Sequence, residues 1–376
     1  MWRVQLFKLN YDNREAEAVS DVIKSGWITM GEKTKGFEND FARSMGDGVH
    51  AAAVSNGTAA LHMALLALGI GPGDEVIVPS LTFVADVNVV RIVGAIPVLA
   101  DCRSFDDWNM DPADIERKIS AKTRAVMLVH YAGYPCDMNA ITDICRRHNL
   151  KLIEDCAHAP GASYNGQACG AIGDIGCFSF FTNKNLSVGE GGMVTTRDEA
   201  LDREIRYIRS HGMTTLTLDR HKGRAISYDV TRPGLNYRID EMRAALGIVQ
   251  LAKLSDANQK RRRIVERYRA ELGGTQGLVI PFCSERDGAK SSYHIFPVLL
   301  PEQKDRKDVI ESMKADGVQT SIHYPAFQEF SAYRDMFGMT PVAQEISRRA
   351  LTLPLYPEMT EDEVSIVIEA FKKAMG

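Results

Sequence analysis

The sequence predicts an α/β protein in which a large domain, built on a mostly parallel, doubly wound mixed sheet, is followed by a smaller α+β domain. Short apolar runs alternate with helical segments between residues 51 and 154, as in sheets whose parallel strands are joined by helices on both faces. The pattern changes after residue 279, where the strands and helices of a smaller unit follow. We therefore expect residues 1–250 to form an N-terminal segment and the large domain, and residues 251–376 to form the small domain.

Local signals define the elements expected in the first part of the large domain. Asp111 and Asp137 stand where N-caps are expected, Pro112 suits a first helical turn, and the run 71–74 (Gly-Pro-Gly-Asp) separates a helix from a strand. In chain order we expect helices at 11–24 and 35–45, strand 51–54, helix 59–68, strand 75–79, helix 82–93, strand 96–100, a helix opened by residues 111–112, strand 125–130, helix 137–148 and strand 150–154. This alternation is what predicts a parallel sheet.

The remaining chain predicts further strands and helices. An apolar, aromatic run at 177–181 predicts a buried strand that leads into a loop, and a second strand follows at 192–195. Residues 198–210 and 240–272 have helical patterns, whereas 211–235 are irregular, and an irregular stretch of that length is usually functional or reaches a neighbouring subunit. For the small domain we expect strands at 278–282, 293–300 and 319–323, and helices at 306–316, 343–351 and 361–375.

Composition and charge exclude several classes of partner. The chain has 376 residues, 45% of them hydrophobic, and its net charge of -4 provides no basic field that would attract nucleic acid or an anionic membrane. No apolar run reaches the ~18 residues that span a bilayer, and residues 1–5 lack the apolar core of a signal peptide. We expect a soluble, cytoplasmic protein without nucleic-acid or membrane partners. The basic run 260–263 is interpreted as the solvated face of a helix rather than a nucleic-acid patch.

The cysteines predict buried free thiols. Their odd number and their apolar surroundings suit a reducing cytoplasm, and they form neither a Cys-x-x-Cys pair nor a Cys/His spacing typical of zinc sites, so we expect no metal. The seven are Cys102, Cys136, Cys145, Cys156, Cys169, Cys177 and Cys283.

One lysine, Lys184, is a candidate nucleophile. It follows the apolar run 177–181 and precedes a glycine-rich turn at 189–192. Desolvation lowers the pKa of a lysine, and the neutral amine can then form a Schiff base. An ordinary lysine on a surface loop is the alternative, but the preceding run is too apolar for an exposed loop, so we favour a reactive amine.

A second candidate site is the start of the helix at Gly57-Thr58-Ala59. Helix N-termini present unpaired N–H groups and a positive dipole end, glycine lets the backbone approach closely, and threonine can both cap a helix and bind phosphate. An ordinary helix cap is the alternative. The hydroxyl of Ser179 could reach the same phosphate, although a structural hydroxyl is the simpler interpretation. No G-x-G-x-x-G fingerprint is present, which disfavours a nicotinamide dehydrogenase.

The carboxyl ends of two predicted strands supply further candidates. Asp155 stands at such an end, where doubly wound sheets bind ligands, and it could hold a metal, orient a histidine or pair with a protonated pyridine nitrogen; a turn cap is the weaker alternative. An aspartate together with a downstream Schiff-base lysine is the pairing that pyridoxal phosphate requires. Phe83, after another strand, could stack on a planar cofactor, although a core position is the simpler expectation for it.

These motifs together resemble the DegT/DnrJ/StrS group of sugar aminotransferases, which belong to the fold-type I pyridoxal-phosphate class. The resemblance extends from Trp27 to the segment 353–355 (Leu-Pro-Leu). The motifs that carry it are Gly-Thr-Ala-Ala-Leu at 57–61, Gly-Pro-Gly-Asp-Glu-Val-Ile-Val-Pro at 71–79, Glu-Asp-Cys-Ala-His at 154–158, the stretch from Phe178-Ser179-Phe180 to Lys184-Asn185, Gly-Glu-Gly-Gly at 189–192 and Asn-Tyr-Arg at 236–238.

The resemblance implies a role for each matching residue. Lys184 would hold the cofactor as a Schiff base and move the proton during catalysis, Asp155 would keep the ring nitrogen protonated, and His158 would lie beside the phenolic oxygen. Phe83 would stack on the ring. The phosphate would be bound by Gly57, Thr58, Ala59 and Ser179, with Asn236 contributed by a second subunit, so a homodimer with shared active sites is implied.

The implied reaction is a two-stage transamination. Glutamate would convert the cofactor to pyridoxamine phosphate, which would then aminate a keto sugar, most simply a nucleotide-linked 3- or 4-keto-6-deoxy hexose. Candidate substrate contacts are Trp27, Thr29, Arg224, His323 and Tyr324, although Trp27 is as well explained as a packing anchor and His323 as a packed side chain. His221, Lys222 and Arg224 could meet a nucleotide diphosphate or form a solvated basic loop.

Other activities of similar proteins stay open at this point. A keto-inositol (aminocyclitol) aminotransferase would share the same motifs. A sugar dehydratase of the group carries histidine where this chain has Lys184, which argues against it, and a non-catalytic regulatory protein would not need Lys184, Asp155 and Ser179 together. The particular sugar, its nucleotide, its keto position, the stereochemistry and the pathway are not encoded in these motifs.

Overall fold

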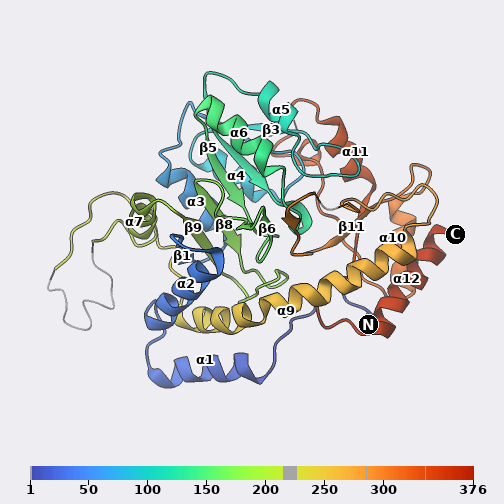
Figure 1. Cartoon of the computed structure of the whole chain (residues 1–376), viewed down its shortest axis with the longest axis horizontal. Coiled ribbons are helices and arrows are strands. Elements are labelled where there is room, and N and C mark those ends of the chain that lie inside the picture. The colour runs from blue at the N-terminus through green and yellow to red at the C-terminus, as the bar shows by residue number, and fades with distance from the viewer. Residues whose placement is uncertain (1, 215–226, 285, 335) are drawn as a thin grey trace.

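A central sheet organises the large domain (Figure 1). The computed structural model describes residues 2–214, 227–284, 286–334 and 336–376. The sheet has seven strands in the order β1-β9-β8-β5-β4-β2-β3; those from β8 to β3 are parallel, whereas β9 is antiparallel to β1 and β8. Their bounds are β1 His50–Val54, β2 Glu75–Pro79, β3 Ile96–Ala100, β4 Thr123–Val129, β5 Lys151–Asp155, β8 Ile175–Ser179 and β9 Gly192–Thr196. The predicted mixed, mostly parallel sheet is confirmed.

Helices cover both faces of this sheet because successive strand residues point to opposite sides. Val54, Val78 and Ile153 pack against one helical layer, whereas their neighbours Ala53 and Leu152 pack against the other. The first layer contains α3 Gly57–Ala67, α4 Ala85–Ile92 and α7 Glu199–Ile208, and the second contains α2 Glu32–Met45, α6 Met138–His148 and α9 Glu241–Leu272. The short α5, Pro112–Arg117, packs on α6, and α1, Asn13–Ser25, lies along α9.

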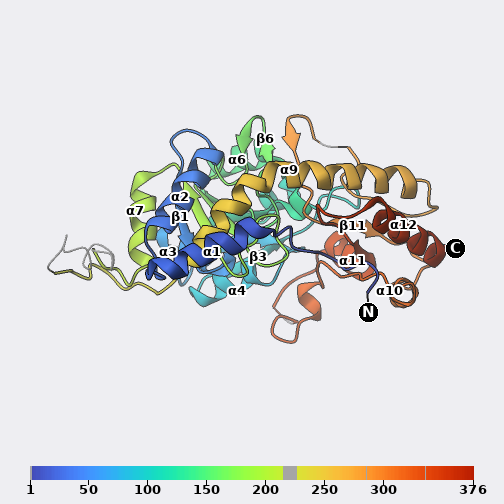
Figure 2. The same cartoon turned by 90° about the horizontal axis from the view of Figure 1, so that it is seen from below.

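The small domain is built around a two-stranded antiparallel ladder. Strands β11, Phe296–Leu299, and β12, Ala350–Leu353, form it. Three helices complete the unit: α10 Arg306–Ala315, α11 Pro341–Arg349 and α12 Glu361–Met375. Figure 2 shows α9 running from the large domain alongside the small one. The N-terminal segment also reaches the small domain, since Val4 pairs with Val318 and Leu355 N–H donates to Leu6 O at 3.2 Å. The division at residue 250 falls within α9 and stays a proposal about organisation.

Several predicted elements differ from the structure. Residues 278–282 and 319–323 are not strands: each contributes one bridge, Val279 to Leu299 and Ser321 to Thr352. Proline lacks an N–H, so Pro281 cannot extend a ladder, and Phe282 next to it has a positive φ of 60°. Helix 82–93 begins only at residue 85, because residues 80–83 form the turn that leaves β2. Three very short strands, β6 Ser163–Tyr164, β7 Gln167–Ala168 and β10 Ala289–Lys290, form a small sheet that was not predicted.

Two expectations about side chains also need correction. Cys283 is exposed, whereas the other six cysteines are buried free thiols as expected. The run 260–263 is not wholly solvated, because Arg261 is 6% exposed and burial lowers its pKa to about 9. A helix with a period of 3.6 residues turns one member of any four-residue run inward, so a basic run can contain a buried arginine. None of the described helices combines the length and apolar character needed to cross a bilayer.

Candidate active site

The carboxyl edge of the parallel strands brings the predicted catalytic residues together. Asp155 ends β5 and Ser179 ends β8, while Phe83 follows β2. The pKa of Asp155 responds to the ammonium group of Lys184, which lies in the loop after β8. This edge is where open α/β sheets bind ligands.

The loop that carries Lys184 is fixed by its neighbour Asn185. The buried Asn185 amide donates to Asn258 Oδ1 at 2.8 Å and to Ser292 O at 2.7 Å, and its Oδ1 bonds to His294 Nδ1 at 2.9 Å. Lys184 itself is only partly accessible, and its burial lowers its pKa to about 8 although Asp155 acts in the opposite direction. The amine therefore lies in a protein environment, which favours the reactive interpretation over an ordinary surface lysine.

Asp155 is buried opposite this amine. Its Oδ1 accepts the N–H of Ala157 at 2.8 Å, so it also caps the turn after β5. Burial raises the pKa of Asp155, while the Ala157 N–H and the Lys184 charge lower it. A second buried carboxyl group, Asp86 in the first turn of α4, lies beside Asp155. The sequence reasoning missed Asp86, because only the fold brings α4 against the end of β5.

The first turn of α3 forms a cradle for an anion. Asn56, not Thr58, is the N-cap: its side chain accepts the N–H of Ala59 at 2.8 Å. The N–H groups of Gly57 and Thr58 consequently have no acceptor within the helix, and the side chain of Thr58 is exposed. A Cβ at Gly57 would lie 2.7 Å from Ser179 Cβ, so glycine is required where α3 meets β8. These groups fit a phosphate.

An aromatic wall closes the edge of the site. Phe83 is 56% exposed, so the expectation of a core position is wrong, and its ring centroid lies 5.8 Å from that of Tyr324. The Tyr324 hydroxyl bonds to His158 Nε2 at 3.0 Å. Because His158 Nδ1 accepts the N–H of Ala132 at 3.2 Å, the imidazole proton lies on Nε2 and is donated to Tyr324. An exposed phenyl ring beside this hydrogen-bonded pair is suited to stack on the planar ring of a cofactor.

Two further histidines pack around this wall. His294, which the sequence reasoning missed, lies 4.4 Å from His158 between ring centroids. His323 Nδ1 bonds to Thr352 Oγ1 at 2.9 Å, and its carbonyl oxygen accepts the hydroxyl of Tyr131. Burial is the main cause that lowers the pKa values of His158, His294 and His323, and the Lys184 charge lowers them further. His323 and Tyr324 reach the site from the small-domain part of the chain.

We expect His323 to make the protein acid-sensitive. Its pKa is about 4 in the folded chain and about 6.5 when unfolded, so the stability from neutral His323 is complete above pH 6.5 and is lost as the pH falls towards 4. This residue accounts for at most about 3 kcal/mol of that loss. Urea unfolding between pH 4 and 7 should show a shallower decline for His323→Asn than for wild type. The exposed His148→Asn control should follow wild type, and parallel profiles for all three proteins would contradict the assignment.

Other predicted site residues lie apart from this cluster in the single chain. The indole N–H of Trp27 donates to Met30 O at 3.4 Å, consistent with the packing-anchor alternative, and Thr29 is exposed. Asn236 is exposed, and its backbone pairs with Ser210. Arg224, together with His221 and Lys222, lies outside the described residues.

A buried group with metal-ligand chemistry lies directly behind Asp155. One ligand atom each of His130, Glu154 and Cys156 lies within 4.8 Å of the others. Hydrogen bonds already occupy the glutamate and the histidine: Glu154 accepts backbone N–H groups from residues 170, 172 and 173 at 2.7–2.9 Å, and its Oε2 lies 3.0 Å from His130 Nε2. His130 Nδ1 in turn accepts the N–H of Cys136 at 3.1 Å. We therefore interpret this group as a structural anchor for β5.

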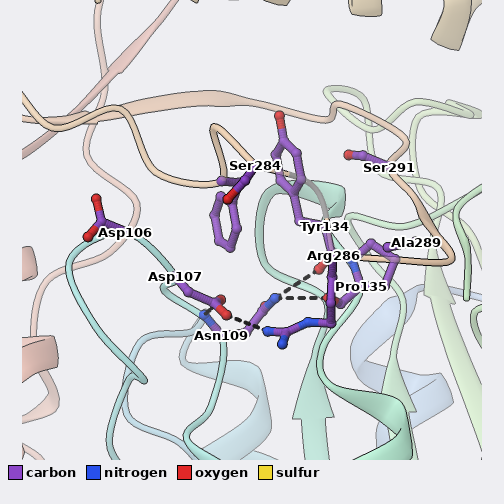
Figure 3. A pocket seen from close by; sticks show the side chains of 10 residues that line it. Asp106, Asp107, Asn109, Tyr134, Pro135, Ser284, Arg286, Ala289 and Ser291 are labelled. Carbon is purple, nitrogen blue, oxygen red and sulfur yellow. Dashed lines mark hydrogen bonds and ion pairs between the residues drawn. The ribbon is translucent and has the colours of Figure 1, made fainter.

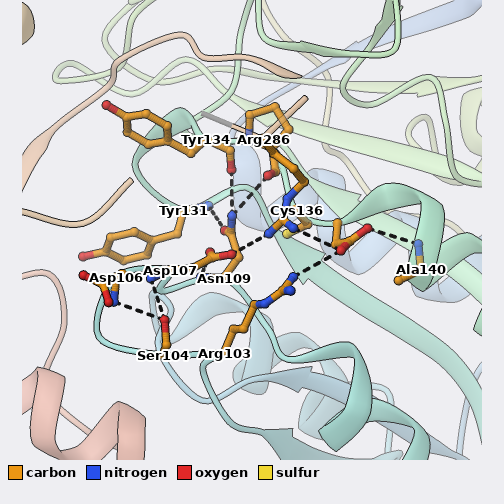
Figure 4. A network of polar contacts seen from close by, with 12 residues as sticks. Arg103, Ser104, Asp106, Asp107, Asn109, Tyr131, Tyr134, Cys136, Ala140 and Arg286 are labelled. Carbon is orange, nitrogen blue, oxygen red and sulfur yellow. Dashed lines mark hydrogen bonds and ion pairs between the residues drawn. The ribbon is translucent and has the colours of Figure 1, made fainter. Parts of the chain in front are cut away.

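A separate cavity of about 210 Å³ is lined in part by Tyr134 and Pro135 of the segment 131–136 (Figure 3). Arg286 contacts Asp107 at 2.5 Å and Asp137 at 3.1 Å, so its charge is compensated (Figure 4). Asn109 donates to the carbonyl groups of Tyr134 and Pro135 at 3.1 and 3.2 Å and accepts the N–H of residue 131. This network fixes the turn whose residue 132 orients His158.

This fold and this site define a type I pyridoxal-phosphate transferase. The chain belongs to the DegT/DnrJ/EryC1/StrS aminotransferase family, which matches residues 10–372. It is therefore a pyridoxal-phosphate-dependent aminotransferase, as predicted.

Relatives cover almost the whole chain. The spore coat polysaccharide biosynthesis protein SpsC of Bacillus subtilis (strain 168) is 38% identical over 367 residues, which cover 95% of this chain and 93% of the relative. The aminotransferase TlmJ from Streptoalloteichus hindustanus superimposes with a TM-score of 0.91 at 33% identity and covers 100% of this chain and 99% of its own. Spr1654 from Streptococcus pneumoniae, in a pyridoxamine-phosphate form, gives a TM-score of 0.90 at 30% identity and covers 97% of each chain.

Proposed function

We propose that this protein is a sugar aminotransferase that moves the amino group of L-glutamate to a keto sugar, a nucleotide-linked 3- or 4-keto-6-deoxy hexose. The observation that carries the proposal is the partly buried Lys184, with its lowered pKa, at the sheet edge that also holds Asp155 and the α3 cradle. Two relatives support the sugar: SpsC is named for polysaccharide biosynthesis, and Spr1654 is named as a candidate sugar aminotransferase.

Each residue of the site has a role in this proposal. Pyridoxal phosphate, held here, would supply an electron-withdrawing ring and would carry the amino group between the two half-reactions. Lys184 would hold the cofactor through its amine and would accept and return a proton at its nitrogen during the transfer. Asp155 would keep the ring nitrogen protonated, and the neutral His158, which bonds to Tyr324, would lie beside the phenolic oxygen. The residues that bind the phosphate are Gly57, Thr58, Ala59 and Ser179.

The substrate side of the site is formed by aromatic and neutral groups. Phe83 would stack on the cofactor, while His323 and Tyr324 would border the sugar. Burial lowers the pKa of His323 and raises that of Tyr324, so both side chains are uncharged at neutral pH. An uncharged wall can hold a polyhydroxylated ring by hydrogen bonds. We assign Trp27, Thr29 and Arg224 to the outer part of the substrate site, and the reaction to the cytoplasm, where buried free thiols stay reduced.

A substrate panel tests this function. The protein purified with pyridoxal phosphate should be yellow, and L-glutamate should bleach it and release 2-oxoglutarate. The bleached form should then aminate nucleotide-linked 3- or 4-keto-6-deoxy sugars, which is detected from product mass. Amination of keto-inositols alone would show that the substrate is an aminocyclitol precursor and not a sugar nucleotide. Loss of a sugar hydroxyl without amination would indicate a dehydratase, and a colourless preparation would contradict the function altogether.

We further propose that the enzyme is a homodimer whose subunits share their active sites through Asn236. This residue is exposed in the single chain, although the resemblance assigns it to a phosphate site. Asn236→Asp should weaken cofactor binding because a carboxylate repels phosphate. Hybrids of Lys184→Ala and Asn236→Asp subunits should recover up to about a quarter of wild-type activity, since half of the dimers are hybrid and each hybrid has one intact site.

Two controls accompany the hybrid experiment. The exposed Asn139→Asp variant should behave like wild type, because residue 139 lies on α6. Sedimentation should show dimers for every variant. Failure of mixed, re-equilibrated subunits to recover activity would show that each chain forms its site alone.

A further inference from the structure

We propose that Asp86 is a positioning residue that keeps a proton and donates it as a hydrogen bond to Asp155, so that Asp155 stays ionised and directed at the cofactor ring nitrogen. The inference rests on the proposed function only in placing that ring nitrogen beside Asp155. It assigns a role to a residue that the motifs of the site do not include.

The surroundings of Asp86 favour the protonated form of its carboxyl group. Asp86 is 1% exposed, and its Oδ2 accepts the hydroxyl of Thr82 at 2.6 Å. Its other oxygen, Oδ1, is buried and meets no hydrogen-bond donor among the described residues. A buried carboxylate oxygen without a donor is costly. The Asp155 carboxyl group lies within hydrogen-bonding reach of Asp86. Since two adjoining buried carboxyl groups do not both ionise, they share one proton.

The partners of each carboxyl group decide which of them keeps that proton. Asp155 accepts the N–H of Ala157 and is attracted by the Lys184 charge, both of which favour its ionised form. Asp86 has only the Thr82 hydroxyl. Burial, followed by repulsion from Asp155, raises the pKa of Asp86 well above its ordinary value. The proton therefore belongs on Asp86, and Asp155 carries the charge.

Groups on other elements respond to the same pair. From β8, the pKa of Cys177 is raised by burial and then by both aspartates, and the pKa of Tyr324 in the small-domain part shows the same pattern. The Lys184 charge adds positive potential at Asp155. Among the described residues, Asp155 is the charged group that affects the pKa of Asp86 itself.

A neutral Asp86 would hold Asp155 in position without cancelling its charge. The Asp86 hydroxyl occupies one lone pair of Asp155 and fixes the carboxylate plane, leaving the remaining oxygen positions for the ring N–H. If Asp86 ionised, the repulsion between the two carboxylates would displace Asp155 or transfer the proton to it. The interaction with the ring nitrogen would then be lost.

The pH dependence of apoenzyme stability tests directly whether the carboxyl group of Asp86 is protonated. A carboxyl group with a raised folded pKa contributes stability that is complete below its unfolded pKa and is lost as the pH rises through the folded pKa. Wild-type apoenzyme should therefore lose more thermal stability between pH 5 and pH 8 than Asp86→Asn, whose amide donates the same hydrogen bond but does not titrate. Coincident pH profiles of the two proteins would overturn the proposal.

Two more measurements, an infrared band and cofactor binding, distinguish a role of the Asp86 proton from a role of its side chain in packing alone. Wild-type apoenzyme at neutral pH should show the infrared carbonyl band of a buried, protonated carboxyl group, and Asp86→Asn should lack that band. Asp86→Asn should bind pyridoxal phosphate within about threefold of wild type, whereas Asp86→Leu, which has no donor, should lose about tenfold or more. Equal binding by both variants, or an unchanged band in Asp86→Asn, would refute the role.

These measurements use no sugar substrate, so they are independent of the proposed reaction. If no sugar is aminated but the band and the pH profile change as expected, the proton assignment stands and the substrate proposal fails. If a sugar is aminated but Asp86→Asn retains the band and the wild-type pH profile, the proton assignment alone fails. Should Asp86→Leu not fold, the Asp86→Asn measurements decide the question.

Discussion

Replacing Lys184 by alanine is expected to lower the rate of amino transfer by at least about 10³-fold, because the variant loses both the amine that attaches the cofactor and the group that moves the proton. The purified variant should also lack visible absorbance that borohydride bleaches. The measurement is turnover of glutamate with a keto sugar, together with the absorption spectrum before and after borohydride.

The matched control for Lys184→Ala is Lys122→Ala. Lys122 is exposed between α5 and β4, so its loss should change neither the spectrum nor turnover. Lys184→Arg retains a cation but cannot form the covalent bond, and it should be as inactive as Lys184→Ala. Normal turnover in either Lys184 variant would contradict the assignment of the catalytic amine.

Replacing Glu154 by alanine is expected to produce the largest loss of stability, about 3–5 kcal/mol. Glu154 is 0% exposed and accepts three backbone N–H groups, at 2.7–2.9 Å, as well as a bond from His130. Alanine would leave the buried donors of residue 170 and His130 without an acceptor, at about 1–3 kcal/mol each. The N–H groups of residues 172 and 173 are only partly buried, so water can replace part of what they lose. Urea unfolding should report this as a lower transition midpoint.

Two variants establish whether the Glu154 effect arises from these donors. Glu154→Gln keeps the shape but replaces one acceptor by an amide donor, so it should lie between alanine and wild type. The exposed Glu190→Ala should match wild type. If Glu154→Ala unfolds at the wild-type midpoint, the buried carboxylate is not the anchor of β5.

Much of the fold could be predicted from the sequence because the strands and helices of the large domain have clear hydrophobic periodicity and are bounded by helix caps and turn residues. The bounds of β2, β3 and α12 agree with the predicted 75–79, 96–100 and 361–375. The predicted strands at 278–282 and 319–323 failed because pairing depends on a partner strand, and each segment forms only one bridge, to Leu299 of β11 and to Thr352 of β12. Strands of two residues, such as β6, are too short to show alternation.

The candidate site was predicted where a motif joins a residue type to the end of a strand or helix, as for Lys184, Asp155 and Gly57. Residues whose meaning comes from contact between distant segments were not found. Asp86 resembles an ordinary first-turn acid of a helix until the fold places it beside Asp155. His294 likewise gains a role only by bonding to Asn185.

The path of the chain between the two halves has a practical consequence for making fragments. A fragment that stops at residue 250 would cut α9 and remove Leu251 and Leu254 from the cluster that packs on α2. It would also lack the last turns of α9, which pack on the core of the small domain. The complementary fragment would lack the N-terminal residues that pair with residue 318. Separate expression of either half should therefore give aggregated material, and a nick or an inserted tag is better tolerated in an exposed loop.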